Sequence, residues 1–350
     1  MANVLQRTTV NVPTGMLPPS LKDNSKTQGL TLNGYGGTIG NVKLLEPYFP
    51  DTPIEELKKH YKEDGVIWVK GLIDRELVMK CRSDYLSMAN EGTGMLKPGT
   101  NPVDGIFSGA DWRDFLLPGA VRLAAGLKDE GKFVENAMKS HSAPFYQEFK
   151  DEVGHKLESF VGRLCDFEKP WCLPRSLLRC AVPGGETTPV HYDQIFLRAA
   201  PPTSITAWVP IGDVDLLGGG LIYLDRSLEV GRKYEGDFSK KNAELSYEDK
   251  ISAFNKNMQA GGWIDRNAST FGENWSRSWL VGKYEAGDVV FHDPYTIHAG
   301  ARNDDPYDRI RVSTDLRFVD KAKAYDTRWT HIAYTEDDPN VARKIQIPRS

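Results

Sequence analysis

The stretch TPVHYDQIF, residues 188–196, places His191 and Asp193 one residue apart in a run that reads as a β-strand. Because residues i and i+2 of a strand project from the same face, both side chains are expected to point the same way. One imidazole and one carboxylate then face a single ion. A third ligand would complete the 2-His-1-carboxylate triad that leaves open positions for Fe(II) chemistry. The pair alone is also compatible with a structural histidine–aspartate hydrogen bond.

Composition limits the classes of protein that this chain can belong to. Its 350 residues are 40% hydrophobic and 26% charged, as in a globular protein of one large domain or two ordinary ones. The net charge is −4 and no half is strongly basic, so neither nucleic acid nor a membrane is an expected partner. Four scattered cysteines and a start without an apolar segment predict a cytoplasmic protein with reduced thiols. The sequence does not indicate an oligomeric state.

The first half of the chain has a polar beginning followed by helical patterns. Residues 1–40 are rich in Gly, Pro, Thr and Asn, and we expect them to form a loose leader. Residues 41–350 are expected to form a single domain. Apolar periodicity and capping residues predict a helix over 52–64, a strand over 66–72 and a helix over about 74–89. Residues 110–164 read as mostly helical, with a break at Pro144.

From residue 173 onward the pattern changes to short β-rich runs. Pro, Gly and Asp separate these runs, which is typical of an antiparallel sandwich or barrel. The runs are SLLRCAVPG, VHYDQIFL, ITAWVPIGD, GGLIYLDR, SWLVGKYEAGDVVFHD, HAGARND and RIRVSTDLRFV. A long, charged stretch at about 229–277 interrupts them and is predicted to be a lid-like insertion. The expected fold class is α+β, and mainly β.

Three further motifs stand in a fixed order around TPVHYDQIF. They are YKEDGVIWVKGLIDRELV (61–78), ITAWVPIGDVDLLGGGLIYLDRS (205–227) and GDVVFHDPYTIHAGARNDDPYDRIRVSTDLRF (287–318). Together they resemble the phytanoyl-CoA dioxygenase (PhyH)-like family of Fe(II)/2-oxoglutarate-dependent oxygenases, over about residues 52–320. The resemblance implies a double-stranded β-helix, the jelly-roll and cupin-like core, with N-terminal and supporting helices.

The resemblance also implies a ligand set. His191 and Asp193 match the family's His-x-Asp pair, and His298 matches the distal histidine that follows the GDVV-F motif. These three residues are therefore the expected metal ligands and catalytic centre. His292 lies at the end of the preceding strand, where a packed residue beside the ligands is expected.

An arginine is expected to anchor the C5 carboxylate of 2-oxoglutarate, because its planar fork donates two parallel hydrogen bonds. The spacing from the distal histidine in the family favours Arg309. Arg311 lies two residues along on the same face, and its RVS sequence resembles an Arg-x-Ser motif of other 2-oxoglutarate enzymes. The choice between the two stays open. Ser313 would donate its hydroxyl to the same carboxylate.

The implied activity uses Fe(II), 2-oxoglutarate and O2 to oxidise a C–H bond, while 2-oxoglutarate becomes succinate and CO2. Hydroxylation, desaturation and ring formation are all compatible outcomes. The expected substrate is a small molecule, such as an amino-acid-like or secondary-metabolite intermediate. A fatty acyl-CoA hydroxylase and a non-catalytic binding barrel are the alternatives. The family's PGSH reads LDRSL here (224–228), which argues against a phytanoyl-CoA-like substrate.

Side chains that contact the substrate are harder to identify. Arg179 and Arg198 lie on predicted strands near the site and suit an anionic substrate, although both are equally typical of outward-facing charges. Tyr192, Phe196 and Trp208 are candidates for aromatic walls, although aromatic residues in a sandwich more often belong to the core.

Overall fold

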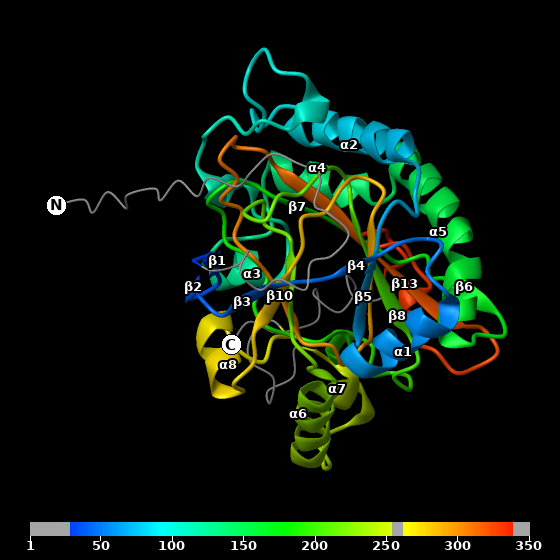
Figure 1. The fold of residues 1–350 in the computed structure, drawn as a ribbon. Helices are drawn as coiled ribbons and strands as arrows, with labels where there is room; N and C mark the ends of the chain where they lie inside the picture. The colour runs from blue at the N-terminus through cyan, green and yellow to red at the C-terminus, as the bar shows by residue number, and fades with distance from the viewer. Residues whose placement is uncertain (1–28, 254–261, 339–350) are drawn as a thin grey trace.

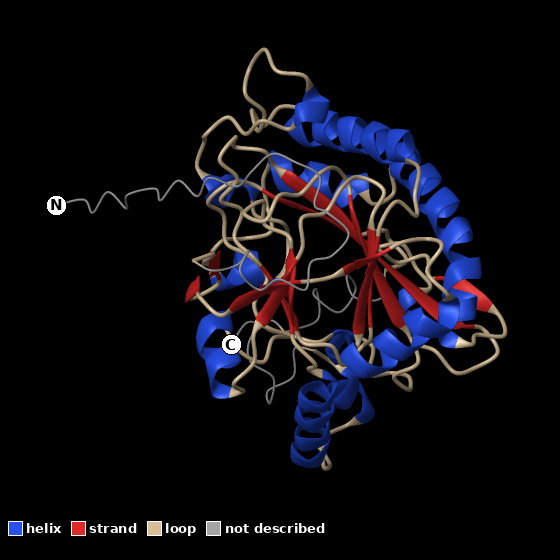
Figure 2. Cartoon of the chain, in the orientation of Figure 1, coloured by secondary structure: helices blue, strands red, loops and turns tan. Residues whose placement is uncertain are grey.

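Two β-sheets face each other, and helices cover their outer surfaces (Figures 1 and 2). The structure is a computed structural model that describes residues 29–253 and 262–338. The larger sheet has the order β4-β5-β11-β8-β13-β6, and β7 also pairs with β13. Its strands are β4 (Pro47–Tyr48), β5 (Val66–Val69), β6 (Pro170–Cys172), β7 (Leu177–Ala181), β8 (Ile205–Pro210), β11 (Val289–His292) and β13 (Arg311–Asp320).

The smaller sheet has the order β12-β9-β10-β3. Its strands are β3 (Val42–Leu44), β9 (Leu221–Leu224), β10 (Trp279–Val281) and β12 (His298–Gly300). Pairing is antiparallel in both sheets except for β4 with β5 and β3 with β10. The chain passes repeatedly from one sheet to the other between β8 and β13, which is the connectivity of a jelly roll. The predicted double-stranded β-helix core is confirmed.

Helices form where capping residues and apolar spacing favour them. They are α1 (Ile54–Asp64), α2 (Arg75–Asn90), α3 (Ala120–Ala124), α4 (Lys132–Ser140), α5 (Pro144–Cys165), α6 (Leu228–Lys241), α7 (Tyr247–Ile251) and α8 (Ala268–Asn274). The Asp74 carboxylate caps α2 by accepting from two backbone N–H groups, and Pro144 starts α5 instead of breaking a helix. Among the described residues, no helix is both long and apolar enough to cross a membrane.

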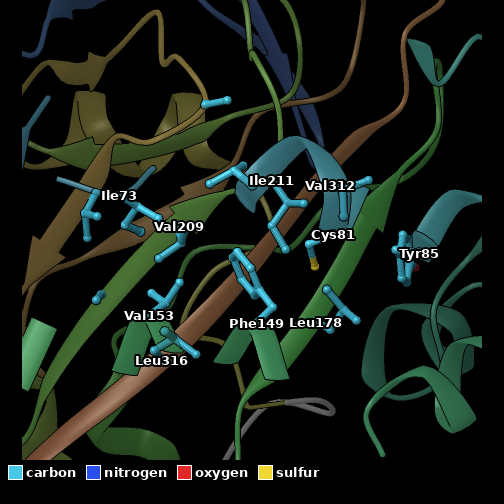
Figure 3. Packing of buried hydrophobic residues seen from close by; sticks show 14 of the residues in the cluster. Ile73, Cys81, Tyr85, Phe149, Val153, Leu178, Val209, Ile211, Val312 and Leu316 are labelled. Carbon is cyan, nitrogen blue, oxygen red and sulfur yellow. The ribbon is translucent and has the colours of Figure 1, made fainter. Parts of the chain in front are cut away.

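The outer face of the larger sheet packs against α2 and α5. Figure 3 shows how Tyr85 and Phe149 from these helices lie with Val209, Val312 and Leu316 from the strands in one apolar cluster. Even-numbered residues of β13 enter this cluster, so its odd-numbered residues face the space between the sheets. Strand β13 therefore presents an apolar face to the helices and a largely polar face to the interior.

Part of the interior is filled by aromatic side chains. The rings of Trp68 and Trp208 meet Tyr284 edge-on, with centroids 5.1 and 4.8 Å apart. Val290 and Tyr223 belong to the same buried cluster. Trp208 was a candidate for an aromatic wall of the site, and it packs in this cluster as a core residue. The rest of the interior carries the charged side chains described below.

Two segments differ from the sequence-based expectation. In the part of the predicted leader that is described, residues 29–40, β1 (Leu32–Gly34) and β2 (Gly37–Ile39) form a hairpin that buries apolar side chains. Residues 1–28 lie outside the described residues. TPVHYDQIF is not a regular strand: Val190 and His191 each form a single bridge, and Asp193 begins a 3-10 turn to Phe196. The two bridges pair with different segments, so no ladder extends along the stretch.

The predicted insertion between β9 and β10 contains α6, α7 and α8, and residues 254–261 within it lie outside the described residues. It contacts the stretch 188–196 directly. Val190 donates its N–H to Asp265 and accepts from Ile264, at 3.0 and 2.8 Å. Figure 1 shows α6 and α7 below the two sheets. Its role as a lid stays a prediction.

Gly65, the residue that ends α1, packs closely against the loop that leads to His298. Its φ of +75° favours glycine, and an added Cβ would lie 2.5 Å from Thr296 Oγ1 and 2.6 Å from Leu228 Cδ2. We expect Gly65→Ala to lower the free energy of unfolding by about 2–4 kcal/mol, from backbone strain and overpacking. Chemical denaturation measures this.

Gly71→Ala is the matched control, because Gly71 has φ +62° and no atom within 4 Å of an added Cβ. It should cost only the strain, about 1 kcal/mol. Equal losses for the two variants would show that the close contact at Gly65 contributes nothing.

Candidate metal centre

His191 and His298 are brought together by their own backbones. Each residue donates its N–H to the carbonyl oxygen of the other at 2.9 Å, which forms an isolated antiparallel bridge. Their rings lie with centroids 4.1 Å apart. Because residues directly opposed in an antiparallel pair project on the same side, one bridge sets both imidazoles toward the same point. This backbone bridge closes a sequence separation of 107 residues.

Both histidines are held in the tautomer that a metal requires. His191 Nδ1 lies 2.9 Å from the Pro189 carbonyl oxygen, and His298 Nδ1 lies 2.9 Å from that of Thr296. A carbonyl only accepts, so each Nδ1 carries the hydrogen and each Nε2 keeps a free lone pair. Burial lowers the pKa of His191. Burial, and then the nearby His191 and His292, hold the pKa of His298 well below its usual range. Neutral imidazoles are the form that ligates metals.

The Asp193 carboxylate, only 2% exposed, is supported by three side chains from three neighbouring strands. Arg317 Nη2 donates to Oδ1 at 2.9 Å, the Thr206 hydroxyl donates to Oδ2, and His292 Nε2 lies 3.3 Å from Oδ2. Arg317 on β13 is directly opposite Thr206 on β8, which is directly opposite His292 on β11. Three side chains in one row across the larger sheet, those of Arg317, Thr206 and His292, therefore contact the same carboxylate.

The electrostatics of this row keep Asp193 ionised. Burial by itself raises the pKa of the carboxyl group, but the Arg317 charge and the His292 hydrogen bond outweigh it. The pKa of Asp193 consequently lies well below its usual range. His292 Nδ1 lies 3.3 Å from the Tyr223 hydroxyl. The position of His292 beside the ligands agrees with the packed role predicted for it.

The ligand atoms of His191, Asp193 and His298 all lie within 4.8 Å of one another. Two neutral nitrogens and one anionic oxygen form the donor set that suits a non-haem Fe(II) site with open coordination positions. The fixed tautomers and the supported carboxylate fit such an ion. The arrangement can therefore hold the metal that the sequence predicted, even though TPVHYDQIF does not form the expected strand.

The two candidate anchors for 2-oxoglutarate have different surroundings. Arg309 makes a bidentate ion pair with Asp305, with its shortest bond at 2.7 Å, and its side chain is 32% exposed. Arg311 is 7% exposed and donates to the Gly219 carbonyl at 3.0 Å and to Ser313 Oγ at 2.6 Å. No carboxylate of the described residues forms an ion pair with it. Ser313 lies on the same interior face.

The substrate-site candidates have mostly structural contacts. Arg198 makes a bidentate pair with Glu235 of α6, which also accepts from the Tyr192 hydroxyl at 2.7 Å. These contacts tie the insertion to the segment on either side of Asp193. Arg179 lies 3.5 Å from Asp315. Phe196 alone of the three aromatic candidates lies near the ligands, with its ring centroid 6.0 Å from that of His191.

Sequence reasoning missed Arg317 and Thr206. Arg317 follows Arg311 by six positions, so a regular strand places both on one face, and this parity was the available signal. Thr206 could be linked to Asp193 only by the register of β8 against β13 and β11, which no short motif contains.

A jelly roll with two histidines and one carboxylate converging inside it defines a class of mononuclear metal-binding proteins. The chain belongs to the phytanoyl-CoA dioxygenase (PhyH) family, whose sequence profile matches residues 61–310. It is accordingly an Fe(II)/2-oxoglutarate-dependent dioxygenase, with Fe(II), 2-oxoglutarate and O2 as its cofactor and co-substrates. The predicted family is confirmed. No curated protein matches the chain.

Several solved structures are similar. The non-heme alpha ketoglutarate dependent carbocyclase SnoK from nogalamycin biosynthesis is 17% identical, over 85% of this chain and 93% of that chain, with a TM-score of 0.49. The epimerase SnoN in complex with Fe3+, alpha ketoglutarate and nogalamycin RO is 20% identical, over 82% and 90%, with a TM-score of 0.47. EvdO2 from Micromonospora carbonacea var. aurantiaca, complexed with 2-oxoglutarate, is 14% identical, over 80% and 98%, with a TM-score of 0.42.

Thr206→Val tests the support of Asp193. The substitution keeps the shape and removes one donor to the carboxylate, so we expect the affinity for Fe(II) to fall by about tenfold, as for other residues that support a metal ligand. Competition with a chelator measures this under anaerobic conditions.

Thr314→Val is the matched control. Thr314 is another buried threonine of this sheet, bonded to the Tyr146 hydroxyl on the opposite face. It should leave the metal affinity within twofold of the unsubstituted protein. Equal metal affinities for both variants would show that the Thr206 hydroxyl does not contribute to metal binding.

Proposed function

We propose that the chain oxidises a C–H bond of a small metabolite at an Fe(II) ion held by His191, Asp193 and His298. The observation that carries this proposal is the convergence of three buried ligands, two with Nε2 free and one kept ionised. When bound, Fe(II) and 2-oxoglutarate would supply activation of O2, with succinate and CO2 as co-products. The chain contributes the fixed ligand geometry and excludes water from it.

We propose Arg311, and not Arg309, as the anchor of the 2-oxoglutarate C5 carboxylate, with Ser313 beside it. A buried guanidinium without an anionic partner is costly, so an anionic ligand is expected there. Burial lowers the pKa of Arg311 to about 10, which leaves it charged at neutral pH. Arg309 already has its carboxylate in Asp305. The Arg-x-Ser motif of the sequence then corresponds to two side chains bonded to each other.

Burial of the site favours a small substrate. The insertion contacts the ligand segment through Val190, and the C-terminal segment contacts it through Trp329, whose Nε1 donates to the Phe196 carbonyl at 3.2 Å. An amino-acid-like or secondary-metabolite intermediate fits such an enclosed centre better than a fatty acyl-CoA. Asp193 would take a coordination position that a halide would otherwise need, which disfavours halogenation. All four cysteines are free, which agrees with the proposed cytoplasmic location.

The first test is anaerobic addition of Fe(II) and 2-oxoglutarate to metal-free protein. A keto acid that chelates Fe(II) gives a weak charge-transfer band in visible absorption. We expect the band in the unsubstituted protein and its loss in His191→Ala, which removes one nitrogen ligand. A non-catalytic barrel without a co-substrate site predicts no band in iron-loaded protein, and that result would overturn the proposal.

The second test separates the two arginines. Arg311→Gln should weaken 2-oxoglutarate binding by about 10- to 100-fold, because a charge-assisted pair contributes roughly 1.5–3 kcal/mol. Arg309→Gln is the matched control and should change it less than threefold. Titration of the charge-transfer band measures both affinities. If Arg309→Gln weakens 2-oxoglutarate binding more than Arg311→Gln does, Arg309 is the anchor and the proposal for Arg311 is wrong.

A further inference from the structure

Arg317 is a buried cation whose hydrogen bonds are incomplete. It is 2% exposed, and its Nη2 donates to Asp193 at 2.9 Å. Its Nε and Nη1 have no hydrogen-bond partner among the described residues. The indole of Trp329 lies against the guanidinium, 4.2 Å from its central carbon, and limits its movement. The side chain is thus held beside the proposed metal ligand Asp193, with two donors unpaired.

Leaving such donors without a partner is expensive, since an unsatisfied group in the interior forfeits its full hydration. The single carboxylate that Arg317 contacts is also the proposed anionic ligand of the metal. Once an Fe(II) ion shares the charge of Asp193, the Arg317 charge is less well compensated. Asp315, the neighbouring acid on β13, pairs with Arg179 at 3.5 Å and forms no ion pair with Arg317 among the described residues. An anion bound at the metal could therefore both satisfy the two unpaired donors of Arg317 and compensate its charge.

We propose that Arg317 binds the metal-chelating C1 carboxylate of 2-oxoglutarate, opposite Arg311 at the C5 carboxylate. This inference rests on the proposed function. Arg317 Nη2 contacts Asp193 Oδ1, the carboxylate oxygen that also lies 3.9 Å from His298 Nε2, so Arg317 lies beside the positions that a bound Fe(II) ion would offer to a further ligand. The C1 carboxylate is the anion that the proposed function brings to those positions. The two arginines then form a clamp selective for a 2-oxodicarboxylate.

The spacing of the clamp agrees with the length of this ligand. Arg311 and Arg317 lie on one face of β13, six residues apart, so their Cα atoms are separated by roughly 20 Å. A five-carbon dicarboxylate with a guanidinium hydrogen-bonded at each end spans about 13 Å between the guanidinium carbons. Two arginine side chains that lean toward each other can cover the remaining distance. A shorter dicarboxylate would leave one end unbound.

Ligands that lack one carboxylate separate the two ends of the clamp. The test uses anaerobic Fe(II)-saturated protein and titrates the charge-transfer band with 2-oxoglutarate and with 2-oxobutyrate, which keeps the C1 carboxylate and lacks the C5 carboxylate. Arg317→Gln should weaken both ligands by a similar factor, at least tenfold. Arg311→Gln should weaken 2-oxoglutarate at least tenfold and leave 2-oxobutyrate within twofold. Arg309→Gln is the control for an arginine that already pairs with a carboxylate, that of Asp305, and should leave both within threefold.

Other outcomes each overturn the proposal in a distinct way. Unchanged affinities of Arg317→Gln for both keto acids would show that Arg317 does not bind the C1 carboxylate and would point to another anion, such as a carboxylate of the substrate. A loss of Fe(II) affinity, with normal binding of both keto acids at saturating metal, would reduce Arg317 to positioning Asp193. Absence of any band in the unsubstituted protein would instead overturn the proposed function itself.

Arg317→Lys keeps the test decisive if Arg317→Gln does not fold. Lysine retains the charge but not the planar fork, so binding of both keto acids should weaken by about three- to tenfold in parallel. If the lysine variant binds 2-oxoglutarate and 2-oxobutyrate as tightly as the unsubstituted protein, a direct contact between the fork and C1 is excluded.

Discussion

The buried carboxylate of Asp193 is the constraint on which the site depends. An isolated carboxylate would not stay ionised at this depth, because transfer out of water costs far more than one hydrogen bond returns. Here a guanidinium, a hydroxyl and an imidazole surround it. These three donors come from adjacent strands and keep the acid anionic without a metal. The proposed metal position is therefore prepared by the fold before any ion binds.

The same constraint links the register of the sheet to the chemistry. A shift of β8 by one residue would turn Thr206 away and place Ala207 opposite Arg317, and the carboxylate would lose a donor. On the other side, the bridge between His191 and His298 attaches the ligand segment to β12 of the smaller sheet. The centre thus spans both sheets. The helices that cover the larger sheet stabilise the register through the apolar face of β13.

Much of this arrangement was predictable from local sequence. Turn residues and short apolar runs predicted the β-rich half, and His191, Asp193 and His298 were predicted as ligands from their motifs and order. The conformation of TPVHYDQIF was not predictable, because its two bridges pair with residues 265 and 298, far along the chain. The sequence also left the choice between Arg309 and Arg311 open. The proposal of Arg311 rests on Asp305, a carboxylate that pairs with Arg309 and not with Arg311.

The insertion adds a second layer of control over the ligand segment. Glu235 of α6 binds the Tyr192 hydroxyl and Arg198, residues that flank Asp193 on either side. Arg198 also stacks on Phe238 of the same helix, with its guanidinium carbon 3.5 Å from the ring centroid. A helix outside the jelly roll is thereby bonded to the residues that flank the proposed metal ligand Asp193, through buried, charge-assisted hydrogen bonds. Variation of the insertion can thus alter the enclosure of the substrate while the strands preserve the ligands and the arginines.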